Sequence, residues 1–203
     1  MKSKFLITFG LVIFLYACDD KPNNAIIADR SEYPPLSDNS VQTPYTDNSG
    51  LIKVTAKNSE GLTEEGDYLN GLRNGNWTVY FANNYPKSIT GYVEGKKQGL
   101  WISLDNRGQL QERAYYHNDK LHGEYVKYNR SRIKEEYLYE NGFLEGPLKK
   151  YYPNGNIMEE SNYKNGKLDG IAKWYDQEGN VTIEYEYKDG EWLNKEEEEE
   201  EEE

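Results

Sequence analysis

A tyrosine recurs along this chain at an almost constant interval. The steps between its positions are 24 residues, except for one of 23 between the third and fourth. The tyrosines are Tyr68, Tyr92, Tyr116, Tyr139, Tyr163 and Tyr187. Two glycine series keep the same register: Gly71, Gly95, Gly142, Gly166 and Gly190, with Asp119 in the third place, and Gly75, Gly99, Gly123, Gly146 and Gly170. Three series in one register predict a repeat array with a period of about 24 residues.

Each repeat predicts two strands joined by tight turns. A polar and aromatic run follows the second glycine, as in Trp77 to Phe81, and a turn such as Pro153-Asn154-Gly155 comes next. The segments between the two glycine series, such as 70–75, are typical of short loops because Asn-Gly pairs favour positive φ. No window keeps the apolar spacing of an amphipathic helix. We therefore expect an all-β repeat array of hairpins of about five to seven residues per strand, forming a single elongated antiparallel meander sheet of about 11 or 12 strands.

The repeat pattern leaves two structural alternatives open. The second glycine needs either a positive φ or a close approach to a neighbouring ring. The aromatic residues two and five places after it differ in strand parity, so either both faces carry rings or a bulge resets the register. The rings are expected to form a core stripe first, although an exposed row would also suit a sugar or a partner peptide. Besides the three series, we assign a structural role in the repeats to Trp77, Trp101, Tyr125 and Trp174.

The charge of the chain is concentrated at its end. The net charge is -12, and residues 195–203, with one lysine and eight glutamates, supply -7 of it. The array itself is almost balanced, so we expect no nucleic-acid partner. The chain has 19 Tyr against 5 Phe, which suits a thin sheet whose hydroxyl groups stay wet.

The N-terminus resembles an export signal. Lys2 and Lys4 precede an apolar run from Phe5 to Ala17, which is shorter than the roughly 20 residues that span a bilayer, so we predict a signal peptide at 1–17. The segment that ends at Cys18, the single cysteine, resembles the lipobox of bacterial lipoproteins, with Tyr16 where that family prefers a small or β-branched residue. The resemblance implies a lipidated Cys18 that anchors the protein to a membrane of the bacterial cell envelope.

Other interpretations of this region stay open. The alternatives to lipidation are an ordinary secretory signal with an incidental cysteine, or an uncleaved anchor. Asp19 and Asp20 fit both an inner-membrane retention signal and a surface-export signal, so the membrane is not determined.

The flanks of the array are expected to be disordered. Residues 18–50 are rich in Asn, Asp, Ser and Pro and predict a tether after the anchor, with a reach of about 30 Å. The repeats then occupy 51–194, and the poly-Glu tail 195–203 should repel itself. We interpret the tail as a solubilising end or as a contact for a basic partner or divalent cations.

The motif Tyr-x-x-Gly-x-x-x-Gly-x-aromatic-x-x-aromatic resembles the bacterial variant of the MORN repeat, from about residue 60 to 192. The match is complete at Tyr68-Gly71-Gly75-Trp77-Tyr80 and weaker at Tyr163-Gly166-Gly170-Ala172-Tyr175. The resemblance implies a sheet of hairpins used as a platform. Members of this family are often labelled antitoxin components of toxin-antitoxin systems.

The sequence offers no catalytic constellation. His117 and His122 flank one turn and are expected to be solvated, and the pairs Glu135-Glu136 and Glu159-Glu160 fit structural or solvated faces of the repeats better than acid/base catalysis. No nucleophile triad or phosphate loop is present. We therefore expect no enzyme, no cofactor, no metal site and no small-molecule substrate.

Together these patterns predict a non-enzymatic, lipid-anchored binding platform or scaffold at the cell envelope, with an envelope protein or polysaccharide as partner. The alternative is an antitoxin or immunity-like protein that neutralises a partner toxin. Because an exported protein does not reach a cytosolic toxin, that alternative would act in the envelope.

Overall fold

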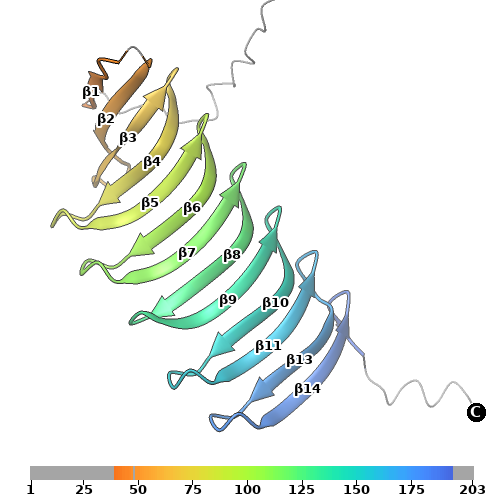
Figure 1. Ribbon diagram of the computed structural model, residues 1–203. Coiled ribbons are helices and arrows are strands. Elements are labelled where there is room, and N and C mark those ends of the chain that lie inside the picture. The colour runs from red at the N-terminus through yellow and green to blue at the C-terminus, as the bar shows by residue number, and fades with distance from the viewer. Residues whose placement is uncertain (1–38, 48, 194–203) are drawn as a thin grey trace, which may run out of the picture. The chain divides into compact units, whose positions relative to one another are not determined.

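The computed structural model describes residues 39–47 and 49–193, and these form a single open antiparallel sheet of 15 strands (Figure 1). The predicted signal peptide, Cys18, most of the tether and the whole poly-Glu tail lie outside the described residues. The described residues contain no helix that could span a membrane. The strands are β1 (Val41–Pro44), β2 (Leu51–Lys57), β3 (Thr63–Leu69), β4 (Leu72–Tyr80), β5 (Pro86–Val93), β6 (Lys96–Leu104), β7 (Leu110–His117), β8 (Lys120–Asn129), β9 (Arg132–Glu140), β10 (Phe143–Tyr151), β11 (Ile157–Lys164), β12 (Lys167–Leu168), β13 (Gly170–Tyr175), β14 (Val181–Lys188) and β15 (Glu191–Trp192).

The topology confirms the predicted all-β meander of hairpins. Each strand pairs with the next one in sequence, except that β12 and β13 both pair with β11. The 15 strands exceed the expected number because β1 precedes the array, a break at Asp169 separates β12 from β13, and β15 adds a two-residue end.

The ordered sheet begins before the first tyrosine of the series. β1 lies within the range 18–50 that the sequence assigned to the tether, and it pairs with β2 from Val41↔Thr55 to Pro44↔Ile52. β2 offers an apolar and β-branched partner strand, which gives this short segment a ladder to join.

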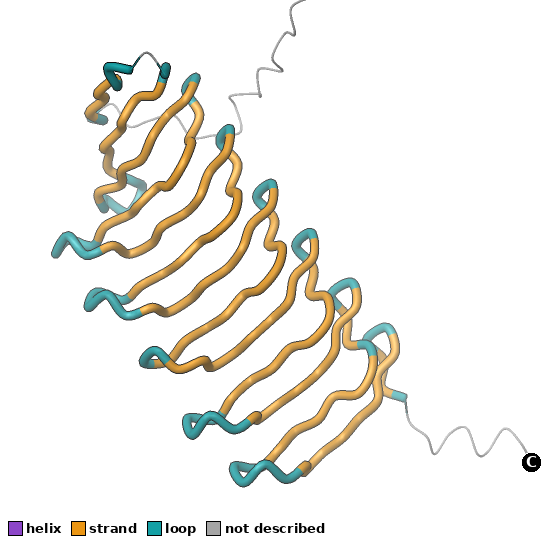
Figure 2. The backbone as a smooth tube through the Cα atoms, viewed as in Figure 1, coloured by secondary structure: helices purple, strands orange, loops and turns teal. Residues whose placement is uncertain are grey.

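The first turn of each repeat contains only two residues. Asn70 and Gly71 have φ values of 53° and 81°, the positive pair of a type I′ hairpin, and the other first turns repeat this pattern. Strands therefore start directly after the turn and reach up to ten residues, longer than the five to seven expected. Each later turn also bonds to the strand that follows the preceding first turn, since the N–H of Gly95 donates to the carbonyl oxygen of Arg73 at 2.8 Å and that of Gly190 to the carbonyl oxygen of Leu168 at 2.8 Å. This bond recurs from repeat to repeat along one edge of the sheet, where Figure 2 shows the turns in a row.

Asp119 replaces glycine in the turn between β7 and β8, and a hydrogen bond of its side chain offsets the cost of its positive φ. Its φ is 66°, a conformation that aspartate tolerates better than most residues. Its carboxylate accepts the backbone N–H of Lys97 at 2.7 Å, a bond that glycine cannot make.

The second glycines lie at bulges within strands, except Gly170, which is the first residue of β13. Between the pairs Glu65↔Thr78 and Asp67↔Asn74, the single residue Gly66 of β3 faces three residues of β4. Gly75, the first of these three, has a φ of 67°, and the nearest atom to the position its Cβ would take lies 3.9 Å away. Positive φ is therefore the reason for this glycine, rather than contact with a ring.

The one short step of the tyrosine series has a local cause. Between β8 and β9 the chain turns on two residues, Arg130 and Ser131, whose φ values are 50° and 64°. The corresponding turn between β4 and β5 spans five residues, from Phe81 to Tyr85. A shorter turn there, partly balanced by a longer strand, leaves the step between Tyr116 and Tyr139 at 23 residues.

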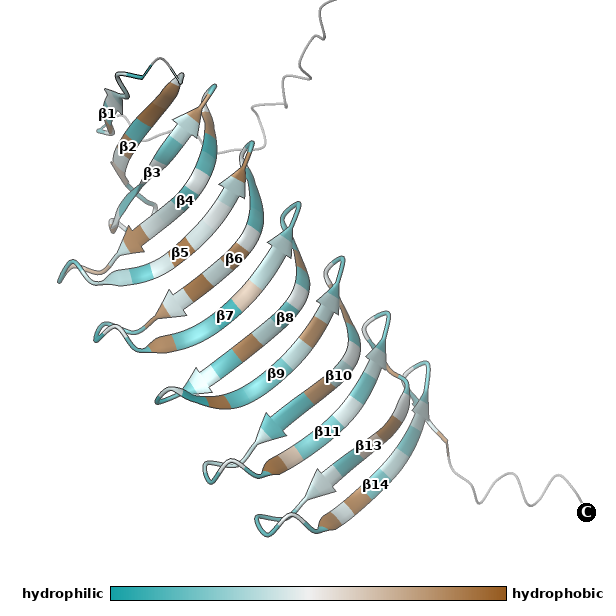
Figure 3. Cartoon of the chain, in the orientation of Figure 1, coloured by the Kyte–Doolittle hydropathy of each residue, from teal (hydrophilic) through white to brown (hydrophobic). Residues whose placement is uncertain are grey.

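The sheet is one layer thick in the described residues, so each of its faces is defined by strand alternation. We call the face that carries Trp77 the aromatic face and the other the opposite face. Trp77 and Tyr80 lie on different faces, and the Tyr80 hydroxyl donates to Glu65 on the opposite face at 2.6 Å. Both faces therefore carry rings, although bulges are also present. The largest buried cluster comprises Val54, Ala56, Tyr68 and Trp77 at the N-terminal end, and Figure 3 shows short apolar bands on successive strands.

Candidate binding surface

The aromatic face collects rings from every repeat. The register of neighbouring strands and the alternation of side chains place on this face Tyr68, Trp77, Tyr92, Trp101, Tyr116, Tyr125, Tyr137, Tyr139, Tyr163, Trp174, Tyr185, Tyr187 and Trp192. Only Tyr68 and Trp77 are buried. Because no second layer covers the described sheet, the remaining rings are at once its core and its accessible surface.

Small residues on alternate strands make room for these rings. In the cross-strand row of Trp77, the partner on β5 is Thr90, and Thr90 in turn faces Trp101 on β6. The row continues through Ala114 to Tyr125. At its start, a Cβ on Gly66 would lie 2.5 Å from the Trp77 ring, so only glycine fits beneath this tryptophan.

Three tyrosines form the centre of the aromatic face. The ring centroids of Tyr125 and Tyr137 are 5.5 Å apart in a stacked arrangement, and Tyr139 lies 6.0 Å from Tyr125. The ammonium of Lys127 is 5.8 Å from the Tyr125 centroid and 5.3 Å from that of Tyr137, within the range of a cation–π contact. The centre therefore combines ring faces with a cation.

Glu135 is the buried carboxylate of this centre. It is 9% exposed, accepts the Tyr137 hydroxyl, and forms ion pairs with Lys127 at 3.0 Å and Lys134 at 2.9 Å. Burial acts to raise its pKa, but the hydrogen bonds from Tyr137 and the two lysines outweigh it and hold the pKa at about 2. The same hydrogen bond, added to burial, raises the pKa of Tyr137. The group is a fixed charge network and has the structural role that the sequence favoured.

A second cation–π cluster, formed by Arg73, lies at the N-terminal end of the aromatic face. The guanidinium of Arg73 is 4.2 Å from the centroid of Trp77 and 5.5 Å from that of Tyr92. Burial acts to lower the pKa of Arg73, but the carboxylate of Glu64, paired at 2.8 Å, raises it overall. The cation is thereby held between two rings at neutral pH.

The opposite face is more strongly charged. Its ring hydroxyls donate to glutamates, as Tyr151 does to Glu136 at 2.6 Å. Ion pairs cross its strands, with Lys149–Glu160 at 3.4 Å as an example. A hollow is lined mainly by residues of this face, Glu124, Val126, Glu136, Leu138, Pro147 and Lys149, and also by Tyr137, whose ring the register places on the aromatic face.

The two histidines lie together at the edge of the first turns. Their ring centroids are 5.8 Å apart, with His117 bonded to the Gln98 amide at 3.2 Å and His122 accepting the N–H of Asn141 at 3.4 Å. In residues 39–47 and 49–193, no group of three or more His, Cys, Asp or Glu is placed to hold a metal ion.

The remaining residues predicted from the sequence divide by role. The first glycines form the turns, the second glycines form the bulges, and each second glycine from Gly75 onward pairs with the tyrosine that opens the next repeat, as Gly75 does with Tyr92. Trp174 lies 6.1 Å from Tyr185 on the aromatic face. The sequence analysis did not single out Gly66, Arg73 or Glu64. For Gly66 alone a signal was available, since this glycine lies two residues before Tyr68 of the tyrosine series.

Comparison with known families supports the repeat assignment. Residues 144–165 and 168–189 each match a family model described as MORN repeat variant. The two matched segments cover β10 to β14, where the motif is weaker than in the first repeat. No curated protein matches the chain.

Proposed function

We propose that this protein is a non-enzymatic binding platform, anchored at the bacterial cell envelope through a lipid on Cys18. Its aromatic face binds a protein or polysaccharide partner of the envelope. The observation that carries the proposal is the uncovered row of half-buried rings, with Arg73, Lys97 and Lys127 placed over them.

Two further arguments support this function. MORN repeats are in general protein- or membrane-binding modules, and two segments match their variant. Rings that keep one edge in water and cations placed beside them suit extended polar partners, because stacking and cation–π contacts need no deep pocket.

Replacing Tyr116 with leucine is expected to weaken partner binding about fivefold or more while the fold is kept. Tyr116 lies on the aromatic face, 6.5 Å from Trp101, with the Lys97 ammonium 5.0 Å from its centroid. Tyr115, the preceding residue, points to the opposite face and is 39% exposed, so Tyr115→Leu is the matched control. Losses of about 1 kcal/mol are typical for such a ring at an interface.

The measurement is co-sedimentation of the purified chain, carrying Cys18→Ser to remove any lipid, with isolated cell envelopes. Equal losses for Tyr116→Leu and Tyr115→Leu would show that the aromatic face has no special part in binding. Circular dichroism checks that both variants keep the sheet.

Cys18→Ser is expected to abolish both fatty-acid labelling and membrane association in cells. The physical reason is that the apolar segment before Cys18 is too short for a stable span once the acyl chains are missing. Membrane fractionation with labelled fatty acid measures both effects. An unlabelled, cytosolic native chain would contradict the anchor and favour neutralisation of a cytosolic toxin.

A further inference from the structure

The outer side of β14 is an open sheet edge. β14 pairs with β13 from Val181 to Tyr187, whereas β15 covers only Tyr187 and Lys188 on the other side. The N–H of Leu193 donates to the carbonyl oxygen of residue 186 from that outer side at 2.9 Å. Backbone groups of a strand alternate in direction, so those of Glu184 also point outward. Nothing in the part of the chain that the structure describes pairs with them.

The other end of the sheet is protected and this end is not. β1, the first strand, has four residues and ends at Pro44, which has no N–H to offer a further strand. A short edge strand with a proline is a common device against pairing with other chains. The stretch from Val181 to Tyr185 contains no proline and lies at the end of a strand of eight residues.

Side chains along this edge are exposed because, among residues 39–47 and 49–193, only the short β15 and Leu193 lie beside the outer side of β14. Ile183 and Tyr185 on the aromatic face are 46% and 41% exposed, and Val181, beyond the bulge, is 49% exposed. One repeat earlier, where β13 lies beside β11, the residue equivalent to Tyr185 is Ser161, which is 1% exposed. Trp192, at 53% exposed, extends the same apolar border, with its ring 5.3 Å from that of Tyr185.

The charge pattern indicates what the next strand would carry. On the opposite face, successive strands alternate in sign, with Glu160 facing Lys173 and Lys173 facing Glu184 in register. The row is Glu136, Lys149, Glu160, Lys173 and Glu184. It ends on Glu184, whose side chain is 48% exposed and paired on its inner side with Lys173 at 3.2 Å. A cation on the next strand would continue the series, and the eight glutamates of 196–203 that follow in the sequence add negative charge after this edge.

We propose that the outer edge of β14 is a docking site for an extended basic segment of another protein. The segment adds to the sheet as the next antiparallel strand, with a Lys or Arg against Glu184 and apolar side chains against Ile183 and Tyr185. A second copy of β14 does not fit this role, since residues 181–186 contain no Lys or Arg. The proposal goes beyond the platform function, and it depends neither on the lipid anchor nor on the partner of the aromatic face.

The sequence of the sheet itself supplies the probe. In β13, Lys173 already faces Glu184 from the inner side, so a labelled synthetic peptide of residues 167–175 has the composition that the outer side requires. We expect it to bind the full chain, purified in mild detergent, with a Kd below about 1 mM, the weak end of measured affinities. The peptide with Lys173→Glu should bind about fivefold to tenfold more weakly, because like charges oppose across the strands.

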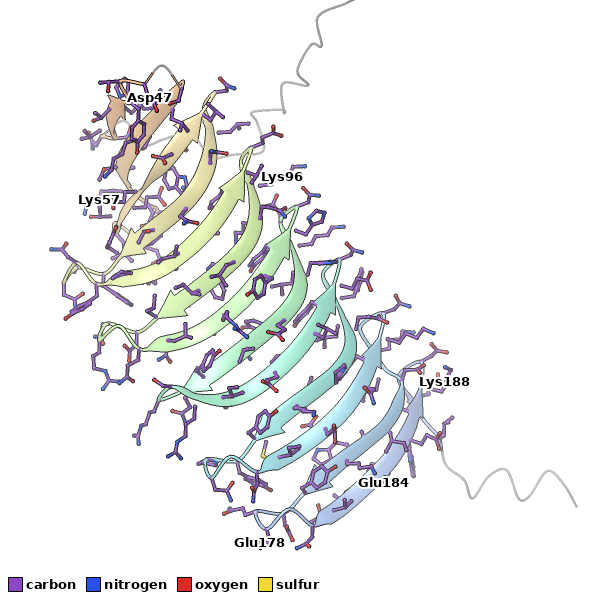
Figure 4. All side chains as sticks on the ribbon, in the orientation of Figure 1. Asp47, Lys57, Lys96, Glu178, Glu184 and Lys188 are labelled. Atoms are coloured by element: carbon purple, nitrogen blue, oxygen red, sulfur yellow. The ribbon has the colours of Figure 1, made fainter. Side chains whose placement is uncertain are left out.

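A charge exchange on the protein makes the test specific. Glu184→Lys is expected to reverse the preference, so that the Lys173→Glu peptide becomes the tighter ligand. The matched control is Glu178→Lys, an exposed turn residue next to β14 that changes the net charge equally without touching its edge, and the preference should not change (Figure 4). Circular dichroism confirms that both variants are folded.

Defined outcomes would overturn the proposal. The proposal is wrong if the native peptide does not bind at about 1 mM, or if both peptides bind with equal affinity. It is also wrong if Glu184→Lys does not exchange the preference between the two peptides. Self-association that the peptide displaces would assign the edge to a second copy instead. Deleting residues 196–203 should weaken binding at low salt, whereas a gain in affinity would mean that the tail occupies the edge.

Discussion

Replacing Trp77 with alanine is expected to destabilise the N-terminal end of the sheet by about 3 to 5 kcal/mol. Trp77 is 2% exposed, its ring meets Tyr68 edge-on at 5.2 Å, and its indole N–H donates to the carbonyl oxygen of Asp67 at 3.0 Å. Alanine would remove the ring that covers Gly66, the hydrogen bond and the contact with Arg73 together. The cluster of Val54 and Ala56 would then be open to water.

The effect should stay local, because each repeat contacts only its neighbours. Amide hydrogen exchange is the suitable measurement, and protection should fall in β2 to β5 while β10 to β14 keep theirs. Trp192→Ala at the other end, where the ring is 53% exposed, is the control and should cost less than about 1 kcal/mol. Equal loss of protection along the whole sheet would contradict a sheet built from independent neighbour contacts.

The period and the turns of this fold could be predicted from the sequence because they rest on local chemistry. Asn-Gly pairs at a fixed interval encode the two-residue turns, and alternating runs encode the strands between them. The register is carried by backbone contacts between repeats, such as the bond from Gly95 to Arg73 at 2.8 Å, and these repeat wherever the glycines repeat.

What the sequence did not show depends on pairing between strands. The expected six-residue loop at 70–75 is a two-residue turn followed by a bulge, because Gly75 continues a strand whose partner has fewer residues. The need for glycine at position 91 was likewise not predictable, since a Cβ there would lie 2.4 Å from the carbonyl oxygen of Gln98 in the next strand. Such a requirement belongs to two segments at once, so the spacing within one segment does not reveal it.

The candidate surface was predictable in kind but not in arrangement. A stripe of rings followed from the tyrosine series, whereas the cations above them did not, because Arg73 and Lys97 occupy a repeat position that holds leucine in the next three repeats. Only the register shows that this position faces the tyrosine of its own repeat, as Arg73 faces Tyr68. A position that varies in chemistry along one row of rings is where partner preference would be encoded.

Stability is expected to fall by roughly 2 to 3 kcal/mol when the pH is lowered from 5 to 2, and Glu135 is the main cause. Its pKa is lowered from 4.5 to about 2 in the folded protein, so the folded state binds this proton less readily than the unfolded chain. The contribution is therefore fully present above the unfolded value of 4.5 and is lost as the pH falls through the folded value of about 2. Urea unfolding across this pH range measures it.

Glu135→Gln separates this carboxylate from general acid denaturation. The amide still accepts the Tyr137 hydroxyl but does not pair with Lys127 and Lys134 as an anion, so the variant should be less stable than the native chain at pH 7. The difference between them should shrink towards pH 2, because protonation removes the same charge from the native protein. Glu124→Gln is the control, since that side chain is 63% exposed and its pair with Arg113 contributes little. A difference between native and Glu135→Gln that stayed constant from pH 5 to pH 2 would show that the buried charge network does not set the acid stability of the sheet.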